Sequence, residues 1–189
     1  MAMRKITLPA MIIAVGLFVA AMTGCSKPGD DQPKQVNTAE QGVVVQPPQS
    51  ASVVVSDLKA RVAQNPNDAD AVVGLANTYF ELKQFNEAIT YYKQALVLKP
   101  GDADIYNELG LCYHYTNNAR EAVRYLEEGI QKNPYHQRIW LTKGFVLAYG
   151  MGDLEAARAS WEKAVALNPE SQIGKAAGEY LAMFKQKRP

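Results

Sequence analysis

The sequence predicts an all-α fold made of stacked helical hairpins, and three observations support this prediction. Prolines recur at positions 66, 100, 134 and 169, at spacings of 34, 34 and 35 residues. Between them, aromatic, leucine, glycine and alanine residues recur in the same order. The two valine triplets, 43–45 and 53–55, are separated by prolines and have no third strand to pair with, so no stable sheet is expected. A period near 34 residues is typical of a repeated helix–turn–helix unit.

The chain begins with a segment, 1–24, that has the pattern of an export signal. Arg4 and Lys5 precede an uncharged, apolar run from Ile6 to Gly24. A positive end, an apolar run and small residues at the cut are typical of a secretory signal peptide. The run is also about long enough to cross a bilayer, so an uncleaved anchor and ordinary secretion remain as alternatives.

Cys25 ends this segment in the tetrad Met22-Thr23-Gly24-Cys25. The tetrad resembles the lipobox of bacterial lipoproteins, usually Leu-(Ala/Ser/Thr)-(Gly/Ala)-Cys, with Met22 in place of the leucine. The resemblance implies a diacylglyceryl group on the Cys25 sulfur and cleavage that leaves Cys25 as an acylated, palmitate-bearing N-terminus. Several acyl chains hold a protein stably at a membrane. We therefore expect an extracytoplasmic, lipid-anchored protein. Ser26 rather than aspartate after the cysteine favours the periplasmic side of the outer membrane.

Residues 25–55 are expected to form a lipidated N-terminus and a flexible, disordered linker. This stretch is rich in Pro, Gln, Gly, Asp and Ser and shows no helical period. A random coil of this length spans roughly 30 Å. The linker would therefore let the folded part sit clear of a lipid surface.

The folded part contains three copies of one pattern. The central copy, residues 103–136, carries Tyr106, Leu109, Gly110, Tyr113, Ala122, Leu126 and Pro134. The copies at 69–102 and 137–170 carry equivalent residues, among them Leu75, Ala76, Tyr79 and Ala88, and Trp140, Gly144, Ala157 and Trp161. The pattern resembles that of the tetratricopeptide repeat (TPR) family, W-x2-L-G-x2-Y, then A-x3-F, then P. The resemblance implies a superhelix, or α-solenoid, of TPR 1 (69–102), TPR 2 (103–136) and TPR 3 (137–170).

Two half units flank the repeats, and two features depart from the pattern. Residues 56–68 and 171–189 are each expected to form a lone helix that caps an end of the stack, which would otherwise expose an apolar face. The third repeat has one extra residue in "AYGMGDL", where two glycines can absorb a longer turn. Lys143 stands where the other repeats have leucine, so its amine must reach solvent or an acid.

Composition and motifs give little support to catalysis or nucleic-acid binding. Segment 1–24 holds two basic residues and no acidic one, so the rest of the chain has 18 basic and 19 acidic residues and a formal charge of −1. Nucleic-acid binding would need a clustered basic surface. The sequence has no nucleophile elbow, phosphate-binding loop or paired-cysteine metal motif. We expect no enzyme, no metal and no cofactor. Cys112, without an intramolecular partner if Cys25 is acylated, is expected to be a buried thiol.

The resemblance implies a binding surface on the first helix of each repeat, chiefly at repeat positions 2, 5, 9, 12 and 13. The residues at these positions that we select as a peptide-binding groove are Asn77, Phe80, Glu81, Asn107, Leu111, His114, Tyr115, Arg138, Leu141, Phe145 and Tyr149. TPRs that clamp a C-terminal carboxylate use basic residues here. Because Val73 and Thr142 stand where lysine or arginine would be needed, a carboxylate clamp is not expected.

These features indicate a membrane-anchored TPR module that binds a peptide or protein partner in a concave aromatic groove, as a scaffold or assembly factor. Aromatic anchors with side-chain amides suit a peptide held by apolar burial and a few hydrogen bonds. The TPR lipoproteins of pilus or secretion-system assembly and the TPR module of cytochrome c maturation are similar in build. The alternative is a structural envelope lipoprotein that self-associates through its end helices.

Overall fold

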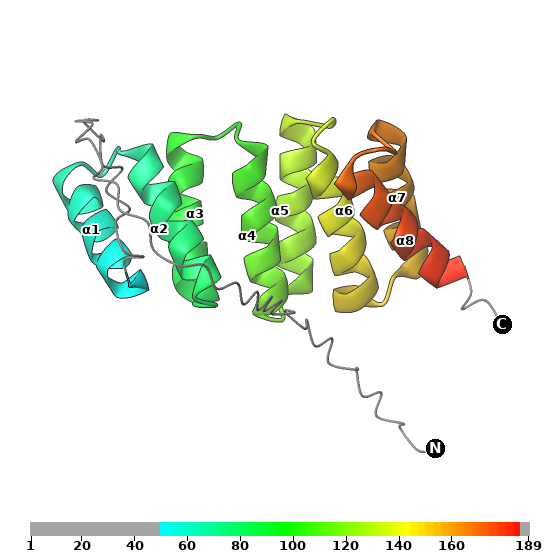
Figure 1. Ribbon diagram of the computed structural model, residues 1–189, viewed down its shortest axis with the longest axis horizontal. Helices are drawn as coiled ribbons and strands as arrows, with labels where there is room; N and C mark the ends of the chain where they lie inside the picture. Colours follow the sequence, from blue (N-terminus) through cyan, green and yellow to red (C-terminus); the bar gives the residue numbers. More distant parts are fainter. Residues whose placement is uncertain (1–49, 186–189) are drawn as a thin grey trace, which may run out of the picture. The chain divides into compact units, whose positions relative to one another are not determined.

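Eight α-helices follow one another along the described part of the chain, residues 50–185 (Figure 1). They are α1 (Ala51–Gln64), α2 (Ala69–Glu81), α3 (Phe85–Leu98), α4 (Ala103–Tyr115), α5 (Ala119–Lys132), α6 (Gln137–Val146), α7 (Leu154–Leu167) and α8 (Gln172–Lys185). This computed structural model has no strand within residues 50–185, so the all-α prediction is confirmed. The expected signal peptide, Cys25 and most of the expected linker lie outside the described residues.

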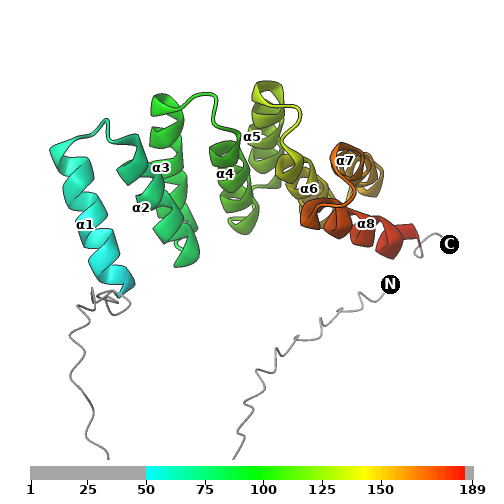
Figure 2. The same ribbon diagram turned by 45° about the horizontal axis from the view of Figure 1, so that its top comes forward.

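Each helix packs against the next one in the chain. The pairs α2–α3, α4–α5 and α6–α7 form three hairpins, while α1 packs on α2 and α8 packs on α6 and α7. Figures 1 and 2 show these helices standing side by side in chain order. Because α4 also contacts α6 and α6 contacts α8, the first helices of the second and third repeats and the C-terminal helix are neighbours. This is the stacked arrangement expected for TPR repeats.

Side-chain caps and prolines set the ends of the helices. The Asp102 carboxylate accepts hydrogen bonds from the backbone N–H groups of Asp104 and Ile105 at the start of α4. Ser171 caps α8 by accepting from the Gly174 N–H at 2.9 Å. Such caps satisfy backbone donors that a helix leaves unpaired. The helices α1, α3, α5 and α7 each end two residues before a repeat proline.

The helix α1 begins earlier than the sequence pattern predicted. We expected a capping helix from residue 56, but the helix starts at Ala51 and includes the valine triplet 53–55. Val55, Leu58 and Val62 pack against the buried cluster of the first repeat. Their spacing of three and four residues places them on one helix face, which explains why the triplet is helical.

The extra residue of the third repeat forms a π-helical turn. This turn, η1 (Leu147–Met151), follows α6 and closes with a hydrogen bond from the Asp153 N–H to the Leu147 carbonyl at 2.9 Å. Gly152 has a φ of 73°, a conformation that glycine adopts without steric cost. A Cβ on Gly150 would lie 2.8 Å from the Ala119 Cβ. Gly152 therefore allows the positive φ of the turn, and Gly150 avoids a clash with Ala119.

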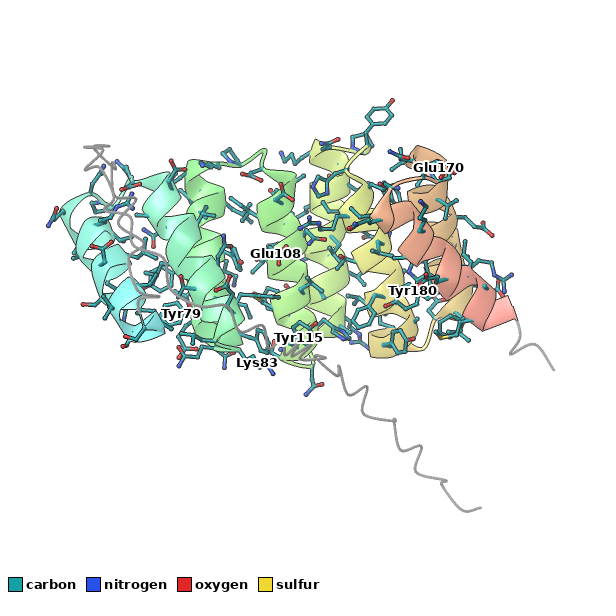
Figure 3. All side chains as sticks on the ribbon, in the orientation of Figure 1. Tyr79, Lys83, Glu108, Tyr115, Glu170 and Tyr180 are labelled. Carbon is teal, nitrogen blue, oxygen red and sulfur yellow. The ribbon has the colours of Figure 1, made fainter. Side chains whose placement is uncertain are left out.

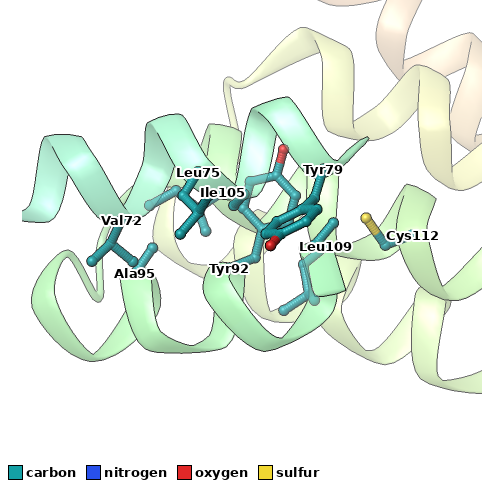
Figure 4. Packing of buried hydrophobic residues seen from close by; sticks show 10 residues of the cluster. Val72, Leu75, Tyr79, Tyr92, Ala95, Ile105, Leu109 and Cys112 are labelled. Carbon is teal, nitrogen blue, oxygen red and sulfur yellow. The ribbon is translucent and has the colours of Figure 1, made fainter. Parts of the chain in front are cut away.

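Apolar clusters run through the stack. Figure 4 shows the first of them, in which Leu75, Tyr92 and Leu109 are fully or almost fully buried. Cys112 lies in the same cluster as a free thiol, and burial raises its pKa to about 12. A thiol with so high a pKa is not a reactive nucleophile at neutral pH. Its surroundings therefore fit the expected structural role.

Gly110, which belongs to the repeat pattern, and Lys143, which departs from it, each contact a neighbouring helix. A Cβ on Gly110 would lie 2.7 Å from Leu126 Cγ, because the two helices of the hairpin approach closely there. The Lys143 amine lies 2.8 Å from the Glu127 carboxylate and 5.9 Å from the Trp140 ring centre. Lys143 thus finds an acid, which was one of the two outcomes that the sequence allowed.

Candidate functional site

A row of aromatic rings crosses the stack from α2 to α8, and we call it the aromatic row. Its members, in order, are Phe85, Phe80, Tyr115, His114, Phe145, Tyr149, Tyr180 and Phe184. Ring centres are 4.8 Å apart for Phe85 and Tyr115, 5.0 Å for His114 and Phe145, and 4.9 Å for Phe145 and Tyr149. Offset or edge-to-face contacts at these distances are favourable beyond the area they bury. The row links three repeats to the C-terminal helix.

An apolar pocket opens in the middle of this row. It has a volume of about 200 Å³ and is lined by Leu111, Tyr115, Leu141, Thr142, Phe145 and Tyr180. Tyr115 is 48% exposed, whereas the other lining residues are partly or fully buried. Figure 3 shows Tyr115 at the end of α4 and Tyr180 on α8. The pocket can take an apolar side chain.

A second and larger depression, the acidic groove, lies between α2 and α4. It has a volume of about 610 Å³ and is lined by Val73, Asn77, Phe80, Glu81, Tyr92, Asp102, Asp104, Ile105, Glu108 and Arg138. Four of these residues are acidic and one is basic. Figure 3 shows Glu108 midway along α4. The acidic groove therefore carries an excess of negative charge over its single guanidinium.

The four carboxylates of the acidic groove differ in how well they are paired. Asp102 caps α4, and Asp104 lies 3.0 Å from His136 Nε2. Glu108 accepts a hydrogen bond from Asn107 Nδ2 at 3.1 Å, and its distance to the guanidinium of Arg138 is 3.8 Å.

Glu108 has the most perturbed environment of the four. Its side chain is 22% exposed, and burial raises its pKa above the ordinary range for a carboxylate, against the opposing effect of the Asn107 hydrogen bond. Burial disfavours the charged form because a low-dielectric surrounding replaces water. The ionised Glu108 is therefore only partly compensated within the protein.

The predicted amides occupy different environments. The Tyr92 hydroxyl donates to Asn77 Oδ1 at 2.7 Å, and Asn77 itself is exposed in the acidic groove. Asn107 is fully buried, and its Oδ1 accepts no hydrogen bond. Asn107 is not among the lining residues of either depression. Of the two, only Asn77 offers a polar group at the surface.

His114 belongs to the aromatic row rather than to a polar site. Its ring meets Tyr115 edge-on at 5.5 Å and Phe145 at 5.0 Å, and its Nδ1 has no hydrogen-bond partner. Burial lowers its pKa below the ordinary 6.5, because an apolar surrounding disfavours the cation. The imidazole is therefore neutral at physiological pH. Within residues 50–185 no three His, Cys, Asp or Glu side chains are placed to hold a metal ion.

Eight of the eleven residues predicted for a groove line one of the two depressions, and Asn107 lines neither. The acidic groove contains Asn77, Phe80, Glu81 and Arg138, and the apolar pocket contains Leu111, Tyr115, Leu141 and Phe145. His114 and Tyr149 line a neighbouring hollow together with Tyr115. Lipidation of Cys25 lies outside the described residues.

Sequence reasoning missed several residues that line these depressions. Glu108 lies next to a chosen repeat position, and Tyr180 lies on a helix interpreted only as a cap. For Tyr180, the available signal was Phe184 four residues later, which places two rings on one helix face.

No helix within residues 50–185 has the length and apolarity needed to span a bilayer.

Comparisons with known proteins agree with this architecture. A family model described as "TPR repeat" matches residues 76–116, and one described as "Tetratricopeptide repeat" matches residues 103–136 and 137–171. A search of curated proteins finds no match.

Several solved structures share the fold. A crystal structure of MamA is 21% identical, with a TM-score of 0.59, over 70% of this chain and 85% of that one. The type III secretion translocator chaperone SycD of Yersinia enterocolitica is 19% identical, with a TM-score of 0.60, over 63% and 92%. The first TPR of Spaghetti (RPAP3), bound to the HSP90 peptide SRMEEVD, is 19% identical, with a TM-score of 0.57, over 62% and 90%. At these identities the likeness concerns the fold alone.

The family matches together run from residue 76 to residue 171, just over half of the chain. They cover the second half of α2 and all of α3 to α7. This part of the chain therefore consists of tetratricopeptide repeats.

Proposed function

We propose that this protein is a non-catalytic interaction module that binds a peptide segment of a protein partner across α2, α4 and α6. The observation that carries the proposal is the pairing of an apolar pocket with a larger polar groove on these helices. The pocket supplies apolar burial, and Asn77 and the carboxylates of the acidic groove supply hydrogen-bond acceptors. This combination suits a peptide better than a small apolar molecule.

Tyr115 is the strongest candidate for an anchor of such a peptide. It is 48% exposed in the free protein, yet it stacks on Phe85 and borders the apolar pocket. Large aromatic residues at the centre of an interface commonly contribute most of the binding free energy. Because the ring is already held by its neighbours, little side-chain entropy is lost when a ligand covers it.

Two structural relatives support this class of function. The Spaghetti TPR was solved with a peptide bound to it, and SycD is a chaperone of secretion translocators. We propose that this chain also handles a protein partner, as a scaffold or assembly factor. Since Val73 and Thr142 stand where a carboxylate clamp needs cations, and the acidic groove holds four carboxylates against one guanidinium, we propose a different class of peptide from one that ends in acidic residues.

The test compares two tyrosine variants. Tyr115→Ala removes a candidate anchor, whereas Tyr135→Ala removes a ring that is 77% exposed in the loop before α6, away from both depressions. Each variant would be used to capture partners from an envelope extract, with circular dichroism as the check on folding. Loss of an anchor commonly costs about 2 kcal/mol or more, roughly thirtyfold in affinity.

We expect Tyr115→Ala to lose specific partners with its helicity intact and Tyr135→Ala to keep them. Retention of every partner by Tyr115→Ala would contradict the proposed binding surface. The alternative function, self-association through the end helices, predicts concentration-dependent sedimentation of the protein without any partner.

We also propose that the protein is anchored to a membrane outside the cytoplasm through lipid on Cys25. The support is the sequence of residues 1–25, which has an apolar export signal ending in a lipobox-like tetrad. Cys25→Ser should release the protein from membranes or leave an unprocessed precursor. Cys112→Ala is the control, because that thiol is buried in the fold. A Cys25→Ser variant that is processed and still extracted only by detergent would disprove the anchor.

A further inference from the structure

The acidic groove and the apolar pocket are adjacent along α4. Glu108 lines the first, and Leu111 and Tyr115 line the second. Residues three and four apart on a helix lie on the same face, so these side chains form one continuous path. From Glu108 to Tyr115 the helix rises about 10 Å, at 1.5 Å per residue. An extended peptide covers that distance in about three residues.

Glu81 and Glu108 both line the acidic groove, and neither charge is fully compensated within the described residues. Glu81 is the last residue of α2. A carboxylate there is unfavourable, because the C-terminal end of a helix carries a partial negative charge. Among the described contacts Glu81 has no ion-pair partner, while Glu108 is half-buried with its guanidinium partner at 3.8 Å. Neither helix formation nor packing accounts for two acids in these places.

Asn107 orients the Glu108 carboxylate from a buried position. It lies on α4 between Asp104 and Leu111 and lines neither depression. The residue is fully buried, and its Oδ1 accepts no hydrogen bond, while its Nδ2 donates to Glu108. The hydrogen bond from Nδ2 helps to hold the Glu108 carboxylate in place at the acidic groove, which Glu108 lines.

We propose that the occupant is a cationic peptide segment, in which an arginine or lysine side chain enters between Glu81 and Glu108. An apolar side chain about three residues away along the segment occupies the apolar pocket. This inference rests on the proposed peptide-binding function and names the class of peptide. Its basis is charge complementarity: four carboxylates against one guanidinium in the acidic groove, beside a pocket that has no charged lining residue.

The peptide bound to one structural relative differs in charge from the occupant proposed here. The peptide in the Spaghetti structure, SRMEEVD, contains three acidic residues and one arginine, so its side chains carry a net negative charge. Such a segment would place like charges beside Glu81 and Glu108, and juxtaposed like charges at an interface oppose binding. A peptide with that net charge is therefore not expected to bind in the acidic groove.

The test is a selection from a library of random heptapeptides on the purified full chain, followed by affinity measurements on the selected peptides. The variants are Glu81→Gln and Glu108→Gln, which keep the side-chain shape and remove one charge each. Glu162→Gln is the matched control, because Glu162 is an exposed acid on α7 outside both depressions. A hydrogen bond to a charged group is worth at least roughly tenfold in affinity.

We expect the selected peptides to contain arginine or lysine about three positions from a large apolar residue. Their affinity should fall about tenfold or more in either groove variant, stay unchanged in Glu162→Gln, and weaken with added salt. Peptides that require Tyr115 but contain no excess of basic residues would overturn the cationic preference and leave the peptide groove standing. A selection without binders, or with binders indifferent to Tyr115, would overturn the proposed function as well.

Discussion

Replacement of Gly144 by alanine should destabilise the C-terminal part of the fold, although alanine favours helices more than glycine does. A Cβ on Gly144 would lie 2.3 Å from Trp161 Nε1 and 2.5 Å from its Cδ1. The indole cannot retreat, because Trp161 is fully buried and donates to the Leu141 carbonyl at 3.2 Å. The indole also stacks on the Tyr180 ring, with ring centres 4.9 Å apart.

The size of the effect follows from two opposing contributions. Overpacking of a rigid core typically costs about 1–3 kcal/mol, and a contact of 2.3 Å with a pinned ring belongs at the upper end of that range. Alanine in place of glycine inside a helix returns about 1 kcal/mol. The expected net change for Gly144→Ala is a loss of about 2 kcal/mol in the free energy of unfolding.

The assay is urea unfolding followed by circular dichroism, with Gly178→Ala as the matched control. Gly178 also lies inside a helix, α8, but a Cβ there would meet nothing within 4 Å. The control should therefore gain stability, by up to about 1 kcal/mol. If Gly144→Ala were as stable as the wild type while Gly178→Ala gained, the close approach of α6 to Trp161 would be wrong.

Three further substitutions test other parts of the stack. Gly110→Leu should lower the thermal midpoint clearly, since even a Cβ would lie 2.7 Å from Leu126, and an unchanged melting curve would contradict the placement of that hairpin. Because burial lowers the pKa of His114 below 6.5, the unfolded chain binds the proton more readily, so stability should fall as the pH drops through that value. His114→Phe should flatten the dependence of the urea midpoint on pH between about pH 7.5 and about pH 5.5. An unchanged pH dependence would show that other groups cause it. Lys143→Leu should change stability by less than about 1 kcal/mol, because an ion pair near the surface contributes little and leucine fits the repeat pattern; a large loss in urea unfolding would show that the Glu127 pair matters more.

The arrangement of helices could be predicted because the residues that start, stop and pair the helices of each repeat lie close together in the sequence. The prolines stop helices, Asp102 and Ser171 cap them, and Gly110 and Gly144 stand where neighbouring helices come close. Those signals act within a few residues or within one hairpin. The early start of α1 at Ala51 escaped this reasoning, because a valine triplet favours strands unless a helix face is already there to pack it.

The candidate site was harder to predict, since it depends on how one repeat covers the next. Asn107 occupies a repeat position that usually faces the groove, yet it is fully buried. Glu108, its neighbour in the chain, faces the acidic groove instead. Tyr180 joins the apolar pocket because α8 packs on α6. Which face of a helix is buried depends on how neighbouring repeats pack against each other. A repeat template describes an average repeat and does not contain this information.

The two depressions differ in what they can contribute to recognition. The apolar pocket is lined by common core-like residues, so it can supply affinity but would accept many apolar side chains. The acidic groove holds its charges on two different helices, Glu81 on α2 and Glu108 on α4, so its geometry depends on the stacking of two repeats. Charge complementarity governs choice of partner and the rate of encounter more than it governs affinity. Selection among partners should therefore reside in the acidic groove, and substitutions at the boundary between the first two repeats should alter specificity before they alter the strength of apolar binding.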